Sequence, residues 1–232
     1  LGGKNPAIIF ADCDYDEMLQ TTVRSSFANQ GQICLCGSRI FVEASMYQKF
    51  KIDFIAAVSK LKVGNPFDTN TDIGALVSRP HLEKVKMYID NAAKYGGKVI
   101  FGGATVSVDN SEDGYYLEPT IIEVQDNSCI LNQEEIFGPV VTIMPFNDEN
   151  EVVAMANDVS YGLSATLWTN DLKRTMRVSK QIQAGIVWVN TWLLRDLRTP
   201  FGGVKNSGVG REGGFEALRF FTEPKNICIK YN

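Results

Sequence analysis

The chain has 232 residues, of which 44% are hydrophobic and 22% are charged, and its formal net charge is −4. This length allows one large domain or two small ones with a full hydrophobic core. No basic stripe favours nucleic-acid binding, and no apolar run approaches the length needed to cross a membrane. The five cysteines are an odd number at scattered positions. They are unlike a disulfide framework, so we expect a protein of the reducing cytoplasm.

The chain opens with LGGKNPAIIF, which lacks an initiator Met and ends in a strand-like run over 7–10. We therefore expect the chain to be part of a longer protein. A helix is predicted over 14–28, because apolar residues recur there at every fourth position. Asp12 or Asp14 is the expected N-cap of this helix.

Strand-like and helix-like segments alternate along most of the remaining chain. Strands separated by helices of this length are typical of βαβ units. The sequence thus predicts an α/β fold with a mainly parallel sheet flanked by helices. The expected strands cover 39–43, 98–103, 140–146, 164–169 and 185–190, and the expected helices cover 46–61, 81–95, 149–158 and 171–182.

Two segments depart from this alternation. Residues 114–124 contain Pro119, which predicts an edge strand or an irregular one, because proline cannot donate a ladder hydrogen bond. The last segment, FFTEPKNICIKYN, ends in alternating apolar residues with no helix after it. A terminal strand of this kind must pair with an edge of its own sheet or with another subunit.

Cys34 and Cys36 lie in a turn between a predicted helix and a predicted strand. A zinc site needs about four ligands, and the single histidine, His81, is far away in sequence, so we expect no metal site. A disulfide across one residue would be strained. Two interpretations of the cysteine pair remain: two buried thiols, or a nucleophile with a packing neighbour. The surrounding loop amides favour a nucleophile at Cys34, because they can hold an oxyanion.

Four motifs in order resemble the signatures of the aldehyde dehydrogenase superfamily. They are LGGKNP, FANQGQICLCGSR, EEIFGPV (134–140) and PFGGVKNSGVGREGG (200–214). The resemblance covers essentially the whole chain. It implies the C-terminal, catalytic half of an NAD-dependent enzyme, with the cofactor domain in an N-terminal half outside this chain.

The resemblance implies that Cys34 is the nucleophile, that its backbone N–H donates to the oxyanion, and that Cys36 is a packing residue. Glu135 would hydrogen-bond the nicotinamide ribose, and Phe137 would pack near the nicotinamide ring. The general base, a glutamate just ahead of Leu1, and the oxyanion-hole asparagine would lie outside this chain. We therefore expect little or no turnover from the 232-residue polypeptide alone.

Several other matches carry less weight. His81 aligns with a family contact to the cofactor ribose, but a surface histidine at a helix start is the preferred interpretation. Glu212 aligns with a proton-relay glutamate and Glu223 with an interface brace, possibly with Arg211, and both could equally be surface carboxylates. GVGREG (208–213) formally matches a dinucleotide fingerprint but lacks its strand and its later acidic residue, so we expect a loop.

The segment NTWLLRDLRTPFGG (190–203) is similar to the subgroup acting on 2-hydroxymuconic or 2-aminomuconic semialdehyde, whose substrates carry a carboxylate. Arg195 is the candidate clamp for that carboxylate, since a guanidinium binds carboxylate through two hydrogen bonds. Arg198 is the substitute candidate, and Trp192 would wall the substrate tunnel. The alternative is that Arg195 pairs with Asp196 or another local acid.

Three other classes of protein are alternatives for this sequence. A broad-specificity or betaine-aldehyde dehydrogenase is disfavoured for a cationic substrate by the two arginines. A non-catalytic oligomerisation protein would keep the fold, and the CxC spacing speaks against a thioredoxin-like protein.

The predicted domains are a catalytic domain over 1–211 and an oligomerisation tail over 212–232. The expected partners are an aldehyde, the cofactor domain and further copies of the chain, without nucleic acid or membrane.

Overall fold

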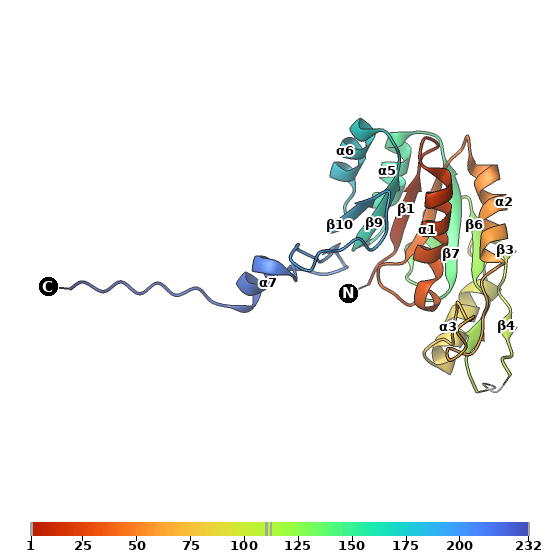
Figure 1. Ribbon diagram of the computed structural model, residues 1–232. Helices are drawn as coiled ribbons and strands as arrows, with labels where there is room; N and C mark the ends of the chain where they lie inside the picture. The colour runs from red at the N-terminus through yellow and green to blue at the C-terminus, as the bar shows by residue number, and fades with distance from the viewer. Residues whose placement is uncertain (1, 110, 112, 232) are drawn as a thin grey trace.

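The computed structural model describes residues 2–109, 111 and 113–231, and a seven-stranded sheet forms its centre (Figure 1). The strands are β1 (Asn5–Ile9), β2 (Gly37–Glu43), β3 (Gly97–Phe101), β6 (Thr120–Val124), β7 (Val140–Phe146), β9 (Ser164–Trp168) and β10 (Ile186–Val189). Their order is β10-β9-β1-β2-β7-β6-β3. All neighbours are parallel except β3 and β6. The predicted α/β fold with a mainly parallel sheet is confirmed.

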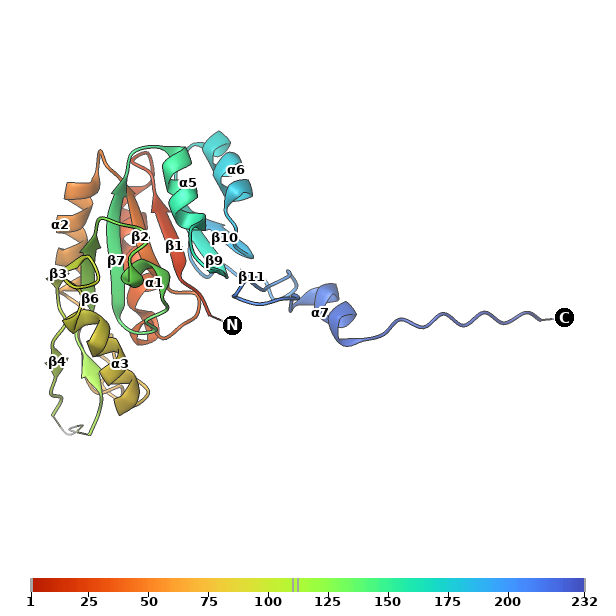
Figure 2. The same cartoon turned by 180° about the vertical axis from the view of Figure 1, so that it is seen from behind.

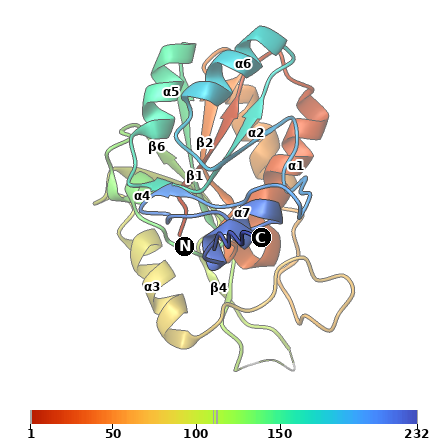
Figure 3. The same ribbon diagram turned by 90° about the vertical axis from the view of Figure 1, so that its left-hand side faces the viewer.

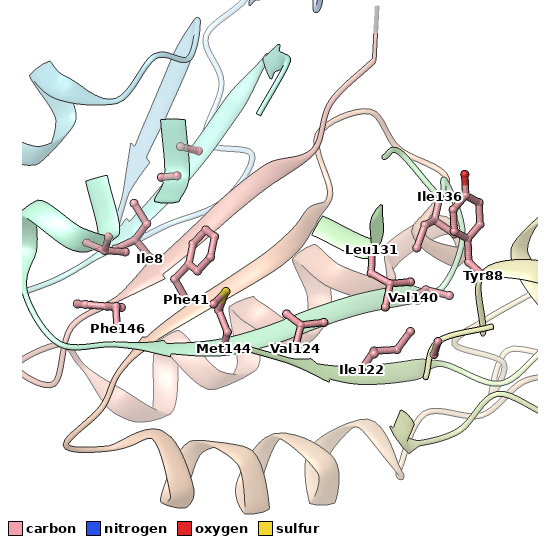
Figure 4. Packing of buried hydrophobic residues seen from close by; sticks show 14 of the residues in the cluster. Ile8, Phe41, Tyr88, Ile122, Val124, Leu131, Ile136, Val140, Met144 and Phe146 are labelled. Carbon is pink, nitrogen blue, oxygen red and sulfur yellow. The ribbon is translucent and has the colours of Figure 1, made fainter. Parts of the chain in front are cut away.

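Helices cover both faces of the sheet, as the views in Figures 2 and 3 show. α1 (Tyr15–Phe27) and α2 (Tyr47–Val58) lie on one face, and α3 (Arg79–Asp90), α5 (Glu149–Asn157) and α6 (Leu172–Gln181) lie on the other. Successive side chains of β1 serve the two faces, because a strand alternates sides. Ile9 packs in the cluster with Met18 and Phe54, whereas Ile8 packs in the cluster with Val152 and Val178, part of which Figure 4 shows.

Helix boundaries follow capping residues. Asp14 is the N-cap of α1, and its carboxylate accepts a hydrogen bond from the N–H of Glu17. α3 begins at Arg79, two residues before the predicted start, because Ser78 caps it and Pro80 fits in the first turn. Both starts are set by side-chain oxygens that satisfy free helix N–H groups.

The segment 114–124 divides at Pro119. β5 (Tyr116–Leu117) pairs with β4 (Thr105–Val106), and β6 starts directly after the proline. The predicted irregularity is confirmed, but the edge position is wrong, because β6 lies between β3 and β7. The proline sits outside the ladder, so its missing N–H costs β6 no hydrogen bond.

The chain leaves the domain after the pair formed by β8 (Tyr161–Gly162) and β11 (Val204–Lys205). α7 (Gly214–Phe221) and the residues after it extend away from the sheet (Figure 1). Residues 222–231 form no strand with the described parts of the sheet. Pairing with the chain's own sheet, one of the two expected possibilities, is therefore wrong, and pairing with another subunit stays a prediction. None of the helices described is long and apolar enough to span a bilayer.

Candidate active site

The cysteine turn links α1 to β2. A short helical turn, η1 (Ala28–Gly31), ends α1, and Asn29 and Gln30 take left-handed backbone conformations with φ of 50° and 59°. This reversal leads into Cys34, whose free thiol is half-buried. Cys36 is only 6% exposed, and its sulfur faces the carbonyl of Ala28 at 3.9 Å. The turn thus presents Cys34 and packs Cys36 inward.

Asn5, at the start of β1, holds the turn in place. Its side-chain amide donates to the carbonyls of Cys34 at 2.8 Å and Cys36 at 2.9 Å. Its side-chain oxygen accepts from the N–H of Ser164 at 3.1 Å. Asn5 is buried, so these bonds are expensive to leave unmade. Sequence reasoning missed this residue, although it lies in the quoted motif LGGKNP.

Gly3 brings Glu135 to the cysteine turn. Its N–H donates to Glu135 Oε1 at 2.9 Å. A Cβ added to Gly3 would lie 2.5 Å from the carbonyl oxygen of Cys34, so no larger residue fits against the turn at this position. Glu135 is half-buried beside the turn, although a glutamate in a turn is more often fully solvated.

The described residues around Cys34 raise the pKa of its thiol. Burial raises the pKa of Cys34, and the negative charge of Glu135 raises it further, while its own amide and Arg195 act in the opposite direction. Desolvation outweighs the effect of the amide, and the expectation that loop amides hold an oxyanion at Cys34 stays a prediction. Burial also raises the pKa of Cys36, to about 12.

The loop carrying Glu135 and Phe137 runs from α4 (Ile130–Gln133) into β7. Ile136 is buried in the core, and Phe137 has a left-handed conformation with φ of 60°. His81 Nε2 lies 2.6 Å from the carbonyl oxygen of Phe137. The expected surface histidine is instead half-buried, because its ring reaches this loop. Phe137 itself remains partly exposed beside the turn.

Trp192 packs against the other side of the cysteine turn. It is 5% exposed, and its indole Nε1 donates to the carbonyl of Leu35 at 3.0 Å. It shares a cluster with Leu163 and Trp188, against which Cys34 packs. The segment after β10 thus returns to the turn, and Trp192 forms part of the wall beside the thiol.

The two candidate arginines have different surroundings. Arg195 pairs with Glu212 at 2.8 Å and lies 4.2 Å from the ring centroid of Phe201. Arg198 pairs with its neighbour Asp196 and is largely exposed. The local acid expected as an alternative partner of Arg195 is therefore Glu212. Of these two arginines, Arg195 is the one whose positive charge lowers the pKa of Cys34.

Among the described residues, the remaining motif residues make no hydrogen bond to the cysteine turn. Arg211 donates to the backbone carbonyls of Gly203 and Gly210. Glu223 lies in the exposed tail. GVGREG forms a loop after the two-residue β11 and outside the main sheet, as expected.

The candidate site lies at the amino ends of the parallel strands. Gly3 precedes β1, Cys34 precedes β2, Glu135 and Phe137 precede β7, and Leu163 precedes β9. Ligands of open α/β sheets usually bind at the carboxyl ends of the strands. A cavity of about 20 Å³ between Gly31, Glu135 and Phe137 has room for one water only, so any larger ligand would bind on the open side. In the described residues no group of three metal-ligating side chains comes together.

Known proteins match this chain over nearly its whole length. The profile of the aldehyde dehydrogenase family matches residues 1–227. The chain belongs to the aldehyde dehydrogenase family. The 2-aminomuconic semialdehyde dehydrogenase of Danio rerio is 52% identical over all of this chain and 48% of its own length. The 2-hydroxymuconic semialdehyde dehydrogenase of Pseudomonas putida is 46% identical over 99% of this chain and 48% of its own length.

A solved aldehyde dehydrogenase has the same fold. The structure of betaine aldehyde dehydrogenase from Staphylococcus aureus in complex with NAD+ matches with a TM-score of 0.92 and 39% identity. The match covers 95% of this chain and 44% of that chain. The resemblance inferred from the four motifs is thus confirmed. This aldehyde dehydrogenase chain spans about half the length of the curated relatives it matches.

The aldehyde dehydrogenase chain also buries two basic side chains that sequence reasoning did not single out. Arg39 donates to the carbonyls of Lys4, Met155 and Ala156 at 2.8–3.1 Å. Lys4 is 2% exposed, and burial, with Arg39 next, lowers its pKa to about 7. No periodicity marks a buried lysine, because only the packing of β1 between two layers removes it from water.

Proposed function

We propose that this chain is the catalytic half of an NAD-dependent aldehyde dehydrogenase that oxidises a semialdehyde with a distant carboxylate. The observation that carries the proposal is the half-buried thiol of Cys34, with Glu135 on one side and the cation of Arg195 near it. Semialdehydes of the 2-aminomuconic and 2-hydroxymuconic type fit this description. Relatives named for these substrates are 45–52% identical to the chain.

Cys34 supplies the covalent step. Its sulfur bonds to the aldehyde carbon after a base outside this chain takes the thiol proton, and a thiohemiacetal forms. The N–H of Cys34 stabilises the oxygen anion of that adduct. When bound, NAD+ supplies the chemistry of hydride acceptance. Loss of hydride leaves a thioester on Cys34, and water then releases the carboxylic acid and restores the thiol.

Glu135 and Phe137 fit a nicotinamide nucleotide. Oε1 of Glu135 is held by Gly3, while Oε2 has no hydrogen-bond partner within the described chain and can accept from a ribose hydroxyl. The partly exposed ring of Phe137 offers an apolar surface for a flat heterocycle. A related structure in complex with NAD+ supports this choice of cofactor.

Arg195 is the proposed carboxylate clamp. A cavity of about 230 Å³ lies beside it, lined in part by Trp188 and Phe201, and this volume suits a small organic acid. Glu212 currently neutralises Arg195 and would have to yield its hydrogen bond to the substrate. Arg198 is less suitable, since Asp196 and solvent already satisfy it. Trp192 would shape the wall between this cavity and Cys34.

The domain division and the partners are part of the same proposal. Residues 1–211 would form the catalytic domain and residues 212–232 an oligomerisation tail. The apolar side chains of α7 support this division, because Phe215 is 81% exposed without a partner in the described chain. The cofactor domain of the same protein and further copies of the chain would complete a cytoplasmic enzyme.

Two matched variants of the full-length protein test the function. NADH formation is measured with 2-hydroxymuconic semialdehyde and with an uncharged aldehyde of similar size. Arg195→Ala should raise KM for the semialdehyde about 10- to 150-fold, as expected for losing 1.5–3 kcal/mol of a charged hydrogen bond, and leave the uncharged aldehyde nearly unchanged. Arg198→Ala should change neither.

Equal effects of Arg195→Ala on both aldehydes would exclude the clamp. Faster turnover of betaine aldehyde than of the semialdehyde would favour the second candidate, a betaine-aldehyde dehydrogenase, which the Staphylococcus aureus structure keeps open. The positive charge of Arg195 argues against that cationic substrate. Absence of any NADH formation would leave a non-catalytic role in oligomerisation as the remaining alternative.

A further inference from the structure

Every backbone carbonyl of the cysteine turn from Gln32 to Cys36 accepts a hydrogen bond. Two of these bonds come from one side chain, because the amide of Asn5 donates to Cys34 at 2.8 Å and to Cys36 at 2.9 Å. The other bonds run from Asn29 to Gln32, from Cys36 to Ile33 and from Trp192 to Leu35. The carbonyl side of the turn is therefore fully bonded to the protein.

The N–H groups in the middle of the same turn are left for another acceptor. Those of Ile33, Cys34 and Leu35 donate to no acceptor within residues 2–109, 111 and 113–231. A planar trans peptide points its C=O and its N–H in opposite directions, so bonds that fix the carbonyls also fix where these N–H groups point. The N–H of Cys34 lowers the pKa of its own thiol, which means that the donor and the sulfur face the same space. The turn thus presents a nucleophile and a hydrogen-bond donor together.

Asn5 is itself held in one orientation. It is 3% exposed, and its Oδ1 accepts from the N–H of Ser164, the first residue of β9, at 3.1 Å. Ser164 needs an acceptor while the two carbonyls of the turn need donors, so the amide oxygen and nitrogen of Asn5 cannot exchange places. Gly3 packs against this amide, because a Cβ added there would lie 2.8 Å from Oδ1 of Asn5. The side chain is a fixed link between β9 and the cysteine turn.

We propose that Asn5 is a positioning residue for the covalent step: its amide holds the turn so that the sulfur and the N–H of Cys34 meet the aldehyde carbonyl together. The inference rests on the proposed function, which makes Cys34 the nucleophile. Asn5 acts in it through the backbone of the turn and not by contact with the aldehyde. A nucleophile displaced by about 1 Å from the carbonyl carbon can lose about a hundredfold in rate, so the loss of these two bonds has a measurable effect.

The first experiment follows NADH formation in a single turnover of the full-length enzyme at saturating aldehyde and NAD+. Asn5→Ala should lower this rate about a hundredfold and leave KM for both substrates within about threefold, because only the alignment of Cys34 changes. Asn5→Ser keeps one hydroxyl donor in place of two amide donors, so its rate should lie between those of Asn5→Ala and the wild type. An Asn5→Ser enzyme no faster than Asn5→Ala, or an Asn5→Ala enzyme with the wild-type rate, would overturn the inference.

Asn157→Ala is the matched control for lost stability. The amide of Asn157 donates to the carbonyl of Gln181 at 2.8 Å and accepts from the N–H of Gln183 at 2.7 Å, so it has a similar bonding pattern with residues outside the cysteine turn. This variant should melt at a lower temperature but keep the single-turnover rate within about threefold of the wild type. Equal losses of rate in Asn157→Ala and Asn5→Ala would show a general effect of destabilisation and would contradict a positioning role.

Alkylation of Cys34 separates positioning from a change in the thiol itself. Iodoacetamide reaches the sulfur from solution and needs no oxyanion donor, so at fixed pH the alkylation rate in Asn5→Ala should not fall below about a third of the wild-type rate. A fall as large as that of NADH formation would mean that Asn5 controls the reactivity of the sulfur, and the positioning role would be wrong.

Cys34→Ser separates failure of the inference from failure of the proposed function. If Cys34→Ser forms no NADH and Asn5→Ala forms it at the wild-type rate, the inference fails and the nucleophile stands. If Cys34→Ser forms NADH at the wild-type rate, the proposed function fails, and the inference fails with it. Where Asn5→Ala does not fold, Asn5→Ser decides: a fall of about tenfold in the single-turnover rate is expected, and an unchanged rate would overturn the inference.

Discussion

The cysteine turn and the segment after β10 face the same candidate site but are built differently. The turn is fixed by buried polar bonds from Asn5, by a glycine contact and by the core beneath it. The segment over 190–231 has exposed ion pairs, such as Arg195 with Glu212, and ends in α7 and a tail with few contacts. Exposed pairs contribute little to stability, so this second region is open to rearrangement by substrate or by a partner.

This difference indicates where residues can be substituted without loss of function. A nucleophile needs a defined position relative to the carbonyl carbon, and buried bonds supply it. A carboxylate clamp and an oligomerisation tail must remain available to other molecules. Five predictions test the contrast between the two regions.

The largest effect is expected at the turn itself. Cys34→Ser in the full-length enzyme should lower kcat at least about a thousandfold, because the hydroxyl is a far weaker nucleophile. Cys36→Ala should lower kcat less than about tenfold, since its sulfur only packs. Steady-state NADH formation measures both. Equal losses in the two variants would contradict the assignment of the nucleophile.

The thiol also predicts a pH dependence. Because burial and Glu135 raise the pKa of Cys34, labelling with iodoacetamide should become faster as pH rises from 7 to 9. The measurement uses a Cys228→Ser background, since that cysteine is exposed. Cys13, whose pKa burial raises to about 11, should react more slowly throughout. A labelling rate for Cys34 that is already constant above pH 7 would show an activated thiolate.

The next effect compares two asparagines. Asn5→Ala should lower the free energy of unfolding by about 3 kcal/mol, because it leaves two buried carbonyls and one N–H without partners. Asn226→Ala, in the exposed tail, should change it by less than about 0.5 kcal/mol. Denaturant unfolding followed by circular dichroism gives both values. Similar small changes would mean that the turn is not held by Asn5.

The burial of Lys4 predicts that the free energy of unfolding depends on pH. Its folded pKa of about 7 lies below the ordinary value of 10.5, so between these values the unfolded chain binds more protons and stability rises with pH. The cost of burying the ammonium is complete below pH 7. Lys4→Met should therefore stabilise the protein by about 2 kcal/mol at pH 6, with the gain shrinking toward pH 10.

The matched control for Lys4 is Lys230→Met in the exposed tail. This variant should show no such pH dependence, because an exposed lysine keeps its hydration in both states. Urea titrations at several pH values compare the two. A Lys4→Met difference that stays constant from pH 6 to pH 10 would show that Lys4 is not buried as an ammonium group.

The smallest effect on unfolding is expected for removal of residues 222–232. The free energy of unfolding of the dilute, dissociated protein should change by less than about 0.5 kcal/mol, because residues 222–231 touch little of the domain. Analytical ultracentrifugation should show a smaller assembly than the intact protein forms. An unchanged assembly would remove the oligomerisation role of the tail.

Much of this protein was predictable from local sequence. The alternation of apolar runs and helical periods predicted most strands and helices of the sheet, because burial on one or two faces imposes those periods directly. The four motifs led to the aldehyde dehydrogenase family, and Cys34, Glu135 and Phe137 were named from them. Arg195 and Arg198 were also identified from the segment 190–203, although the different acidic residues that they pair with were not assigned from the sequence.

Only the tertiary structure decided what surrounds these residues. Four features join segments that are far apart in the chain. They are the inner position of β6, the hydrogen bonds from Asn5 to the cysteine turn, the burial of Lys4, and the contact of His81 with Phe137. Local sequence fixes periodicity and turn chemistry, because these depend on neighbours along the backbone. Desolvation and hydrogen-bond partners depend on neighbours in space, and therefore the direction in which the pKa of Cys34 shifts follows only from the folded chain.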